Sequence, residues 1–289
     1  MIRALKTLRP KQWIKNFFVF LPLVFSVKLF DIPSLITSVT AFLSFCLISG
    51  AIYTLNDLFD LKEDQLHPIK RNRPIASGQL KKSSAWIIVA LSASFSLLLA
   101  LSINLNFAMV ILSYVLLQVL YSSWLKHLVI LDIFSVAAGF FLRVIGGALA
   151  IKVLISSWLI ICTILLALFL SMTKRRHEFF ALSGDARQHR PSLREYNPYL
   201  LDQMISVVTA STLMAYCLYT ISDETIIKFG TRNLVLTTPF VLYGIFRYLY
   251  LVYQKDQGGI PEEIVLRDRP LLINILLWGI ATAFILYFR

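Results

Sequence analysis

A group of oxygen-bearing side chains is clustered in a chain that has only 16 Asp and Glu residues in all. The segment 56–64 reads NDLFDLKED, so Asn56, Asp60 and Asp64 recur every four residues, with Asp57 beside the first of them. On a helix this spacing puts the side chains on one face, where like charges repel each other. A divalent cation would turn that repulsion into ligation, and Mg²⁺ prefers hard oxygen ligands. We therefore predict a magnesium site with Asn56, Asp60 and Asp64 as the metal ligands.

A basic, turn-rich stretch follows the acidic segment directly. Residues 67–78 read HPIKRNRPIASG. Cations beside a carboxylate–magnesium centre would grip a diphosphate from two sides, so we expect Arg71 and Arg73 to contact phosphate. The competing interpretation is an acidic helix end that is solvated among lipid headgroups and paired with Lys62 and Lys70.

The composition of the remaining chain is that of a membrane protein. Of its 289 residues, 57% are hydrophobic and 15% charged, against about 45–50% and about 25% in soluble domains. This excludes a soluble enzyme. The net charge is +12, but a chain mostly buried in lipid offers little surface to nucleic acid, so we expect phosphorylated or anionic lipid partners and no nucleic acid. The three cysteines lie in apolar runs without CxxC spacing, which argues against a disulfide framework and against zinc.

Nine apolar stretches are long enough to cross a bilayer, which requires roughly 20 residues each. The first is the weakest because Pro22 interrupts it, so eight spans is the alternative. We predict an all-α polytopic membrane protein that forms a single integral-membrane domain over residues 1–289. The predicted spans are 14–30, 34–56, 84–102, 106–123, 128–150, 154–172, 203–221, 235–253 and 271–287.

Basic residues are concentrated in alternate loops. Of the 28 Lys and Arg residues, 22 fall on one side of the predicted spans, and cytoplasmic loops are the ones enriched in these residues. We therefore place the N-terminus in the cytoplasm and the C-terminus outside, in a cell membrane. The two long polar loops, about 57–83 and 173–202, both fall on the cytoplasmic side, where we expect the chemistry.

The segment NDLFDLKED, its position after the second span and the loop ending RPIASG together resemble the first Asp-rich motif of the UbiA superfamily of intramembrane prenyltransferases. The resemblance covers essentially the whole chain. It implies a nine-helix bundle with a polar pocket on the cytoplasmic side and Mg²⁺ as cofactor. It also implies that four residues hold the metal and a diphosphate: Asn56, Asp57, Asp60 and Asp64.

Most members of that superfamily carry a second Asp-rich motif, DxxxD, after the sixth span. This chain has Lys174, Arg175 and Arg176 there, followed by Glu178. The reversed charge predicts that this region binds an anion directly, which points to a second phosphorylated substrate. The competing interpretation is a basic anchor at the cytoplasmic end of the span.

Two more strings, RPKQWIKN at 9–16 and YSSWLK at 121–126, resemble a branch of the superfamily that transfers phosphoribose from phosphoribosyl diphosphate (PRPP) to a polyprenyl phosphate. The resemblance implies a polar pocket completed by Tyr121, Lys126, Lys174, Arg175 and Glu178.

Such a transfer must neutralise a leaving diphosphate and align two anions, but it needs no strong base, since the lipid phosphate is already ionised. Electrostatic stabilisation of this kind is usually the largest catalytic contribution. We accordingly expect catalytic roles for Asp57, Asp60, Tyr121 and Lys126. The cations expected to bring the two polyanions together are Lys11, Lys15, Lys126, Lys174, Arg175 and Arg176.

Two charged residues lie inside the fifth span. Asp132, about one turn inside from Lys126, is a plausible ribose or pocket-wall contact. For Arg143, eleven residues further along, we favour pairing with a neighbouring helix, because charges within the membrane normally face the protein interior.

Two other functions compete with phosphoribosyl transfer. The first is transfer of an isoprenoid from an allylic diphosphate to an aromatic or quinone-precursor acceptor, which would use the same Asp-rich motif. The second is a transporter or lipid-binding scaffold, since membrane charges also line transport paths. The isoprenoid length and any association into a homo-oligomer stay open.

Overall fold

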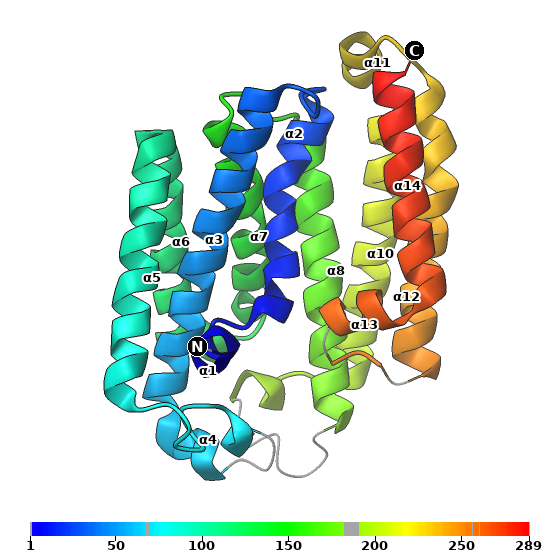
Figure 1. The fold of residues 1–289 in the computed structure, drawn as a ribbon. Helices are drawn as coiled ribbons and strands as arrows, with labels where there is room; N and C mark the ends of the chain where they lie inside the picture. Colours follow the sequence, from blue (N-terminus) through cyan, green and yellow to red (C-terminus); the bar gives the residue numbers. More distant parts are fainter. Residues whose placement is uncertain (1, 67–69, 182–190, 256, 260, 289) are drawn as a thin grey trace. The chain divides into compact units, whose positions relative to one another are not determined.

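The computed structural model describes residues 2–66, 70–181, 191–255, 257–259 and 261–288, and the regular elements within these ranges are helices (Figure 1). Parts of the predicted cytoplasmic loops, including residues 67–69 of the basic stretch and Arg187 and Arg190, lie outside the described residues.

Eight helices of the described chain are long and apolar enough to cross a membrane, which confirms the all-α, multi-span prediction. The stretch predicted as the first span, 14–30, consists instead of a 3₁₀-helix, η1 (Pro10–Phe20), followed by the short helix α2 (Leu21–Phe25). The difference between eight and about nine spans therefore lies in the stretch that Pro22 interrupts. These eight are α3 (Ile32–Phe59), α5 (Lys82–Ile103), α6 (Leu105–Ser123), α7 (Leu131–Ala150), α8 (Ser157–Ala181), α10 (Pro198–Ile221), α12 (Thr238–Gln254) together with the 3₁₀-helix that precedes it, and α14 (Arg269–Tyr287).

The chain divides into two compact units. Unit 1 comprises residues 1–122 and 142–154, and unit 2 comprises residues 123–141 and 155–289. Helix α7 contributes its first part to unit 2 and its second part to unit 1. The short elements of unit 1 are α1 (Ile2–Thr7), α4 (Leu61–Leu66) and η2 (Lys70–Asn72); those of unit 2 are η3 (Leu125–His127), η4 (Pro191–Arg194), α11 (Asp223–Phe229), η5 (Asn233–Thr237) and α13 (Pro261–Arg267).

Unit 1 is built around α3, which packs against α5 and η1. Small side chains allow α3 and α5 to approach closely. Each of the buried hydroxyls of Ser44 and Ser96 donates to the other residue's backbone carbonyl, at 3.0 and 2.8 Å. On another side of α3, Phe45 makes edge-on contacts with the rings of Phe107 and Tyr114. These contacts fix the helix that carries the acidic segment.

Two glycines let the N-terminal segment lie directly on its neighbours. A Cβ added at Gly147 of α7 would stand 2.1 Å from the carbonyl oxygen of Val19, and one added at Gly50 of α3 would stand 2.8 Å from the side chain of Leu8. No side chain fits in the first of these spaces, so glycine is required for η1 to reach α7.

Unit 2 contains two helix pairs, in which α8 packs against α10 and α12 packs against α14. Side-chain caps define where two of these helices begin. The Asn197 side chain accepts from the Leu200 N–H at 2.7 Å, and the Asp268 side chain accepts from the Leu271 N–H at 2.9 Å. Such caps satisfy backbone donors that a helix start leaves unpaired.

Candidate active site

The acidic segment lies at the end of α3 and continues into α4. Asn56 and Asp57 belong to the last turn of α3, whereas Asp64 belongs to α4. Between them Asp60 has φ −83° and ψ 11°, which interrupts the regular helix. The single helical face predicted across 56–64 is therefore divided at Asp60. Asp57 and Asp64 are the two carboxylates that contact a shared partner, Arg73.

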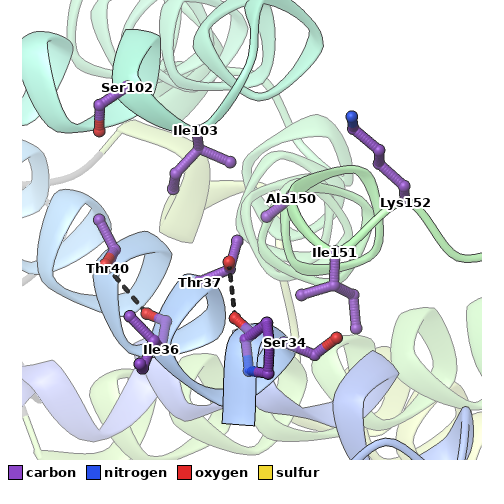
Figure 2. Close-up of a pocket in the computed structure, with 10 residues that line it drawn as sticks. Ser34, Ile36, Thr37, Thr40, Ser102, Ile103, Ala150, Ile151 and Lys152 are labelled. Atoms are coloured by element: carbon purple, nitrogen blue, oxygen red, sulfur yellow. Dashed lines mark hydrogen bonds between the residues drawn. The ribbon is translucent and has the colours of Figure 1, made fainter. Parts of the chain in front are cut away.

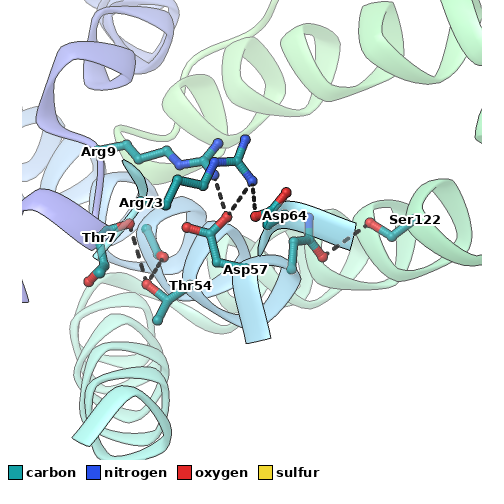
Figure 3. Close-up of polar contacts among 9 residues, drawn as sticks. Thr7, Arg9, Thr54, Asp57, Asp64, Arg73 and Ser122 are labelled. Carbon is teal, nitrogen blue, oxygen red and sulfur yellow. Dashed lines mark hydrogen bonds and ion pairs between the residues drawn. The ribbon is translucent and has the colours of Figure 1, made fainter. Parts of the chain in front are cut away.

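Two arginines neutralise these carboxylates (Figure 3). The Nη1 of Arg73 donates to Asp57 Oδ1 at 3.0 Å and to Asp64 Oδ2 at 2.6 Å. Arg9, from the start of the chain, also donates to Asp57 Oδ1, and its guanidinium lies over the ring of Tyr53. The carboxylate side chains are 3% and 1% exposed, and the arginine side chains about a quarter exposed. The result is a nearly buried cluster with balanced charge.

One oxygen of this cluster is left without a partner. Asp64 Oδ1 is buried and accepts no hydrogen bond, although an unsatisfied buried acceptor is costly, most of all on a charged group. Carboxylate and amide oxygens, which this segment supplies, are the hard donors that suit Mg²⁺. Within the described residues no three His, Cys, Asp or Glu side chains are gathered closely enough to hold a metal. A bound metal would therefore require the carboxylates to exchange their arginine contacts.

The backbone conformation at Arg9 and the packing of the preceding residues place its side chain in the cluster. Arg9 has a left-handed φ of 51°, and Pro10 follows it as the first residue of η1; a proline disfavours the right-handed helical conformation in the residue before it. Two residues before Arg9, the Thr7 carbonyl accepts a hydrogen bond from the Thr54 hydroxyl at 3.4 Å. Sequence reasoning assigned no role to Arg9, although the Arg-Pro pair was a signal for a fixed turn.

The other predicted residues of unit 1 lie around this cluster or along the same elements. The Ser122 hydroxyl donates to Asn56 Oδ1 at 3.3 Å, which ties the end of α6, and with it the neighbouring Tyr121, to the acidic segment. Asp60 is half-buried, whereas Arg71 is exposed. In η1, Lys11 is exposed and Lys15 half-buried. Their roles as metal, phosphate or catalytic groups stay predictions.

Unit 2 contains a second buried network, centred on Asp132 at the start of α7. The Nε of Arg175 donates to Asp132 Oδ2 at 2.9 Å, and its Nη1 donates to Glu178 Oε2 at 2.6 Å. Asp132 is 0% and Arg175 2% exposed. Both were predicted to bind substrate, and each is paired with a protein group of opposite charge. Substrate contact by either residue stays a prediction.

Two residues that sequence reasoning did not single out complete this network. Tyr196 Oη donates to Asp132 Oδ1 at 2.9 Å, and the Ser192 hydroxyl donates to Asp132 Oδ2 at 3.4 Å. Burial raises the pKa of Tyr196, so the phenol keeps the proton that it donates. Both residues follow a loop of low hydrophobicity, and no local spacing connects them to Asp132, more than 50 positions earlier.

The remaining predicted cations of unit 2 differ in exposure. Lys174 is 40% exposed and lies 3.8 Å from Glu178 Oε1. Lys126 lies half-buried in η3. Arg176 forms a hydrogen-bonded ion pair with Asp202 at 2.6 Å and lies over the ring of Tyr253. Lys174 and Lys126 are thus better exposed to an anion than Arg175.

A separate cavity of about 380 Å³ lies near the start of α3 (Figure 2). Thr37 and Thr40 line it, but their hydroxyls donate to carbonyls of their own helix, at 2.8 and 2.9 Å. Asp57 lies twenty positions after Thr37, which corresponds to about 30 Å of helix. This cavity is therefore distinct from the acidic cluster.

Residues 17–263 match the UbiA prenyltransferase family. Curated proteins named decaprenyl-phosphate phosphoribosyltransferase are similar over almost the whole chain. The protein from Mycolicibacterium smegmatis is 33% identical over 95% of this chain and 89% of its own length. The protein from Mycobacterium tuberculosis is 31% identical over 97% of this chain and 94% of its own length.

Solved structures of UbiA homologues share the fold. A homologue from Archaeoglobus fulgidus, bound to DMAPP and Mg²⁺, superposes with a TM-score of 0.73 at 17% identity, covering 99% of this chain and 100% of that one. The same homologue bound to GPP and Mg²⁺ gives a TM-score of 0.71 at 19% identity, over 98% and 96% of the two chains.

Proposed function

Because the chain belongs to the UbiA prenyltransferase family, we propose that it transfers 5-phosphoribose from PRPP to a polyprenyl phosphate and releases diphosphate. The relatives named for this activity match over nearly their full length. The proposed reaction depends on Mg²⁺ and takes place at the cytoplasmic face of a cell membrane, with the N-terminus inside and the C-terminus outside.

The observation that carries the proposal is the cluster of Asp57 and Asp64 with Arg9 and Arg73. A magnesium diphosphate needs carboxylate oxygens for its metal and guanidinium groups for its phosphate oxygens. The cluster contains both kinds of group, and they pair with each other. Binding would replace each carboxylate–arginine contact with a carboxylate–metal or arginine–phosphate contact, so buried charges stay compensated.

The residues present also fit the chemistry of the transfer. An oxygen of the lipid phosphate attacks the anomeric carbon of the ribose, and the bond from that carbon to the diphosphate breaks. Arg9 and Arg73 would stabilise the charge that develops on the leaving diphosphate. Magnesium, held by Asp57 and Asp64 with Asn56 and Asp60, would supply further neutralisation of that charge. In unit 2, Lys126 and Lys174 are the cations proposed to contact anionic substrate.

The test is a transfer assay with purified protein in lipid nanodiscs. Radiolabelled PRPP, Mg²⁺ and decaprenyl phosphate should yield a labelled lipid. Asp64→Asn should abolish this product, whereas Glu63→Gln, an exposed neighbour, should leave it unchanged. Absence of product with any polyprenyl phosphate would overturn the proposal. Product formation from an allylic diphosphate and an aromatic acceptor, but not from PRPP, would support isoprenoid transfer instead.

A further inference from the structure

The loop that carries Lys126 ends in a strained residue. Ile130, directly before α7, has a φ of 68°, a conformation that is a genuine outlier for a β-branched residue. Ile130 is 44% exposed, so tight packing of its side chain does not account for the conformation. Backbone outliers of this kind persist only where surrounding contacts impose them.

Within the loop, the Leu131 N–H donates to the Val129 carbonyl at 2.8 Å across Ile130, and a second hydrogen bond comes from a distant segment. The Ile130 N–H donates to Tyr196 Oη at 2.7 Å. The same hydroxyl donates to Asp132 Oδ1 at 2.9 Å, so Tyr196 connects the end of the loop to the first turn of α7. Tyr196 itself is 3% exposed. Its hydroxyl therefore occupies a fixed position, with one group accepting from it and one donating to it.

The rest of the network fixes Asp132 in turn. Arg175 donates to Asp132 Oδ2, and Ser192 of η4 donates to the same oxygen. Helix η4 also packs against η3, the short helix that contains Lys126. Residues of α8 and of the segment 191–196 thus meet at Asp132, two positions after the loop 124–130, and all of these groups belong to unit 2.

We infer that Tyr196 is a positioning residue, which holds the Lys126 loop in its strained conformation through Ile130 and is itself held by Asp132 and Arg175. In this inference, the strained conformation of Ile130 sets the direction in which η3 presents Lys126. The catalytic part of this inference rests on the proposed function. It also gives buried Asp132 and Arg175 a task that needs no contact with substrate.

The first test measures the loop itself and requires no activity. In Tyr196→Phe, amide hydrogen exchange in peptides that cover 124–130 should accelerate by about tenfold or more, because the Ile130 N–H loses its acceptor. Tyr199→Phe is the matched control, since Tyr199 is 74% exposed and should leave exchange unchanged. Unchanged exchange in Tyr196→Phe would overturn the inference, whether or not the protein uses PRPP.

The second test asks whether Tyr196 acts through Lys126. A misplaced catalytic group costs on the order of a hundredfold, so Tyr196→Phe should lower kcat/KM for PRPP by about tenfold to a hundredfold. In a Lys126→Ala background the same substitution should lower kcat/KM by less than about twofold, because the effects of residues that act through one another are not additive. Equal losses in both backgrounds would show that Tyr196 does not act through Lys126.

A rescue variant separates positioning from general instability. Glycine adopts positive φ at no steric cost, so Tyr196→Phe should lose less activity, and fold better, when combined with Ile130→Gly than alone. Failure of Ile130→Gly to recover either property would contradict the role assigned to the strained residue. If wild-type protein transfers nothing from PRPP, the proposed function fails, while the exchange measurement still decides the contact between Tyr196 and the loop.

Discussion

Asn16 of η1 accepts a hydrogen bond from the Nε of Arg143 at 2.7 Å in the buried interior of unit 1. The same guanidinium donates to Tyr114 Oη at 2.8 Å and lies over the Tyr114 ring. Charged side chains within membrane spans normally face the protein interior and find partners there. Arg143 thereby links the N-terminal segment, which also delivers Arg9 to the acidic cluster, to the second part of α7.

Removing Asn16 should destabilise the protein. In Asn16→Ala the buried guanidinium loses an acceptor, which costs about 1–3 kcal/mol of unfolding free energy. Denaturant titration of the purified protein, followed by circular dichroism, measures this loss. The cost should shrink when Arg143→Met is also present, because the two residues interact directly. Asn233→Ala, at an exposed position, is the control; a loss as large as that of Asn16→Ala would argue against the contact.

Gly147 should tolerate no side chain. In Gly147→Ala the new Cβ would lie 2.1 Å from the Val19 carbonyl oxygen, so η1 or α7 must shift, at a cost of about 1–3 kcal/mol. Gly279→Ala in α14 places its Cβ in open space and should be neutral or stabilising by up to about 1 kcal/mol. Thermal unfolding in detergent compares the two variants. A Gly147→Ala midpoint at or above that of Gly279→Ala would contradict the close approach.

Substitutions of Arg73 and Arg71 should differ sharply in their effects on stability and activity, although the sequence predicted phosphate contact for both residues. Arg73 bridges Asp57 and Asp64, so Arg73→Ala removes the cation that pairs with Asp64 and leaves Asp57 with Arg9. Loss of one partner costs about 3–5 kcal/mol in buried pairs. We expect loss of phosphoribosyl transfer together with reduced thermal stability. Arg73→Lys should regain more stability than activity, because one ammonium does not reproduce a planar guanidinium. Arg71→Ala, at an exposed position, should change mainly the KM for PRPP, and an equal effect of both alanine variants on stability would refute the distinction.

Asp268 should stabilise unit 2 in a pH-dependent manner. Arg247 donates to both of its oxygens, at 3.1 and 2.8 Å, and these hydrogen bonds lower the pKa of Asp268 below its ordinary value of 3.8. A carboxyl with a lowered pKa contributes stability above its ordinary pKa, and that contribution is lost as the pH falls through the folded-state pKa. Asp268→Asn should therefore cost about 0.5–1 kcal/mol at pH 7. The difference should decline below about pH 4 in thermal scans of both proteins, and a difference that grows with acidity would refute the sign.

Several features followed from the sequence because they depend on neighbours along the chain. Apolar runs of about 20 residues predict spans by length alone, and eight of the nine predicted runs each correspond to one of the eight candidate membrane spans. The oxygen-rich segment 56–64 could be recognised from spacing within a few turns. Its division at Asp60 could not, since whether the helix continues depends on what packs around α4.

The partners of the charged residues were decided by tertiary structure. The sequence identified Asp57, Asp64 and Arg73 as candidate groups, but only the fold shows that one nitrogen of Arg73 joins the two carboxylates and that Arg9 joins from 48 positions away. Tyr196 and Asp132 are likewise 64 positions apart. Periodicity determines which face of a helix a side chain occupies, whereas packing between distant segments determines what that face meets. The sequence alone therefore predicted a family, its spans and its acidic motif, and the fold decided which charges compensate one another.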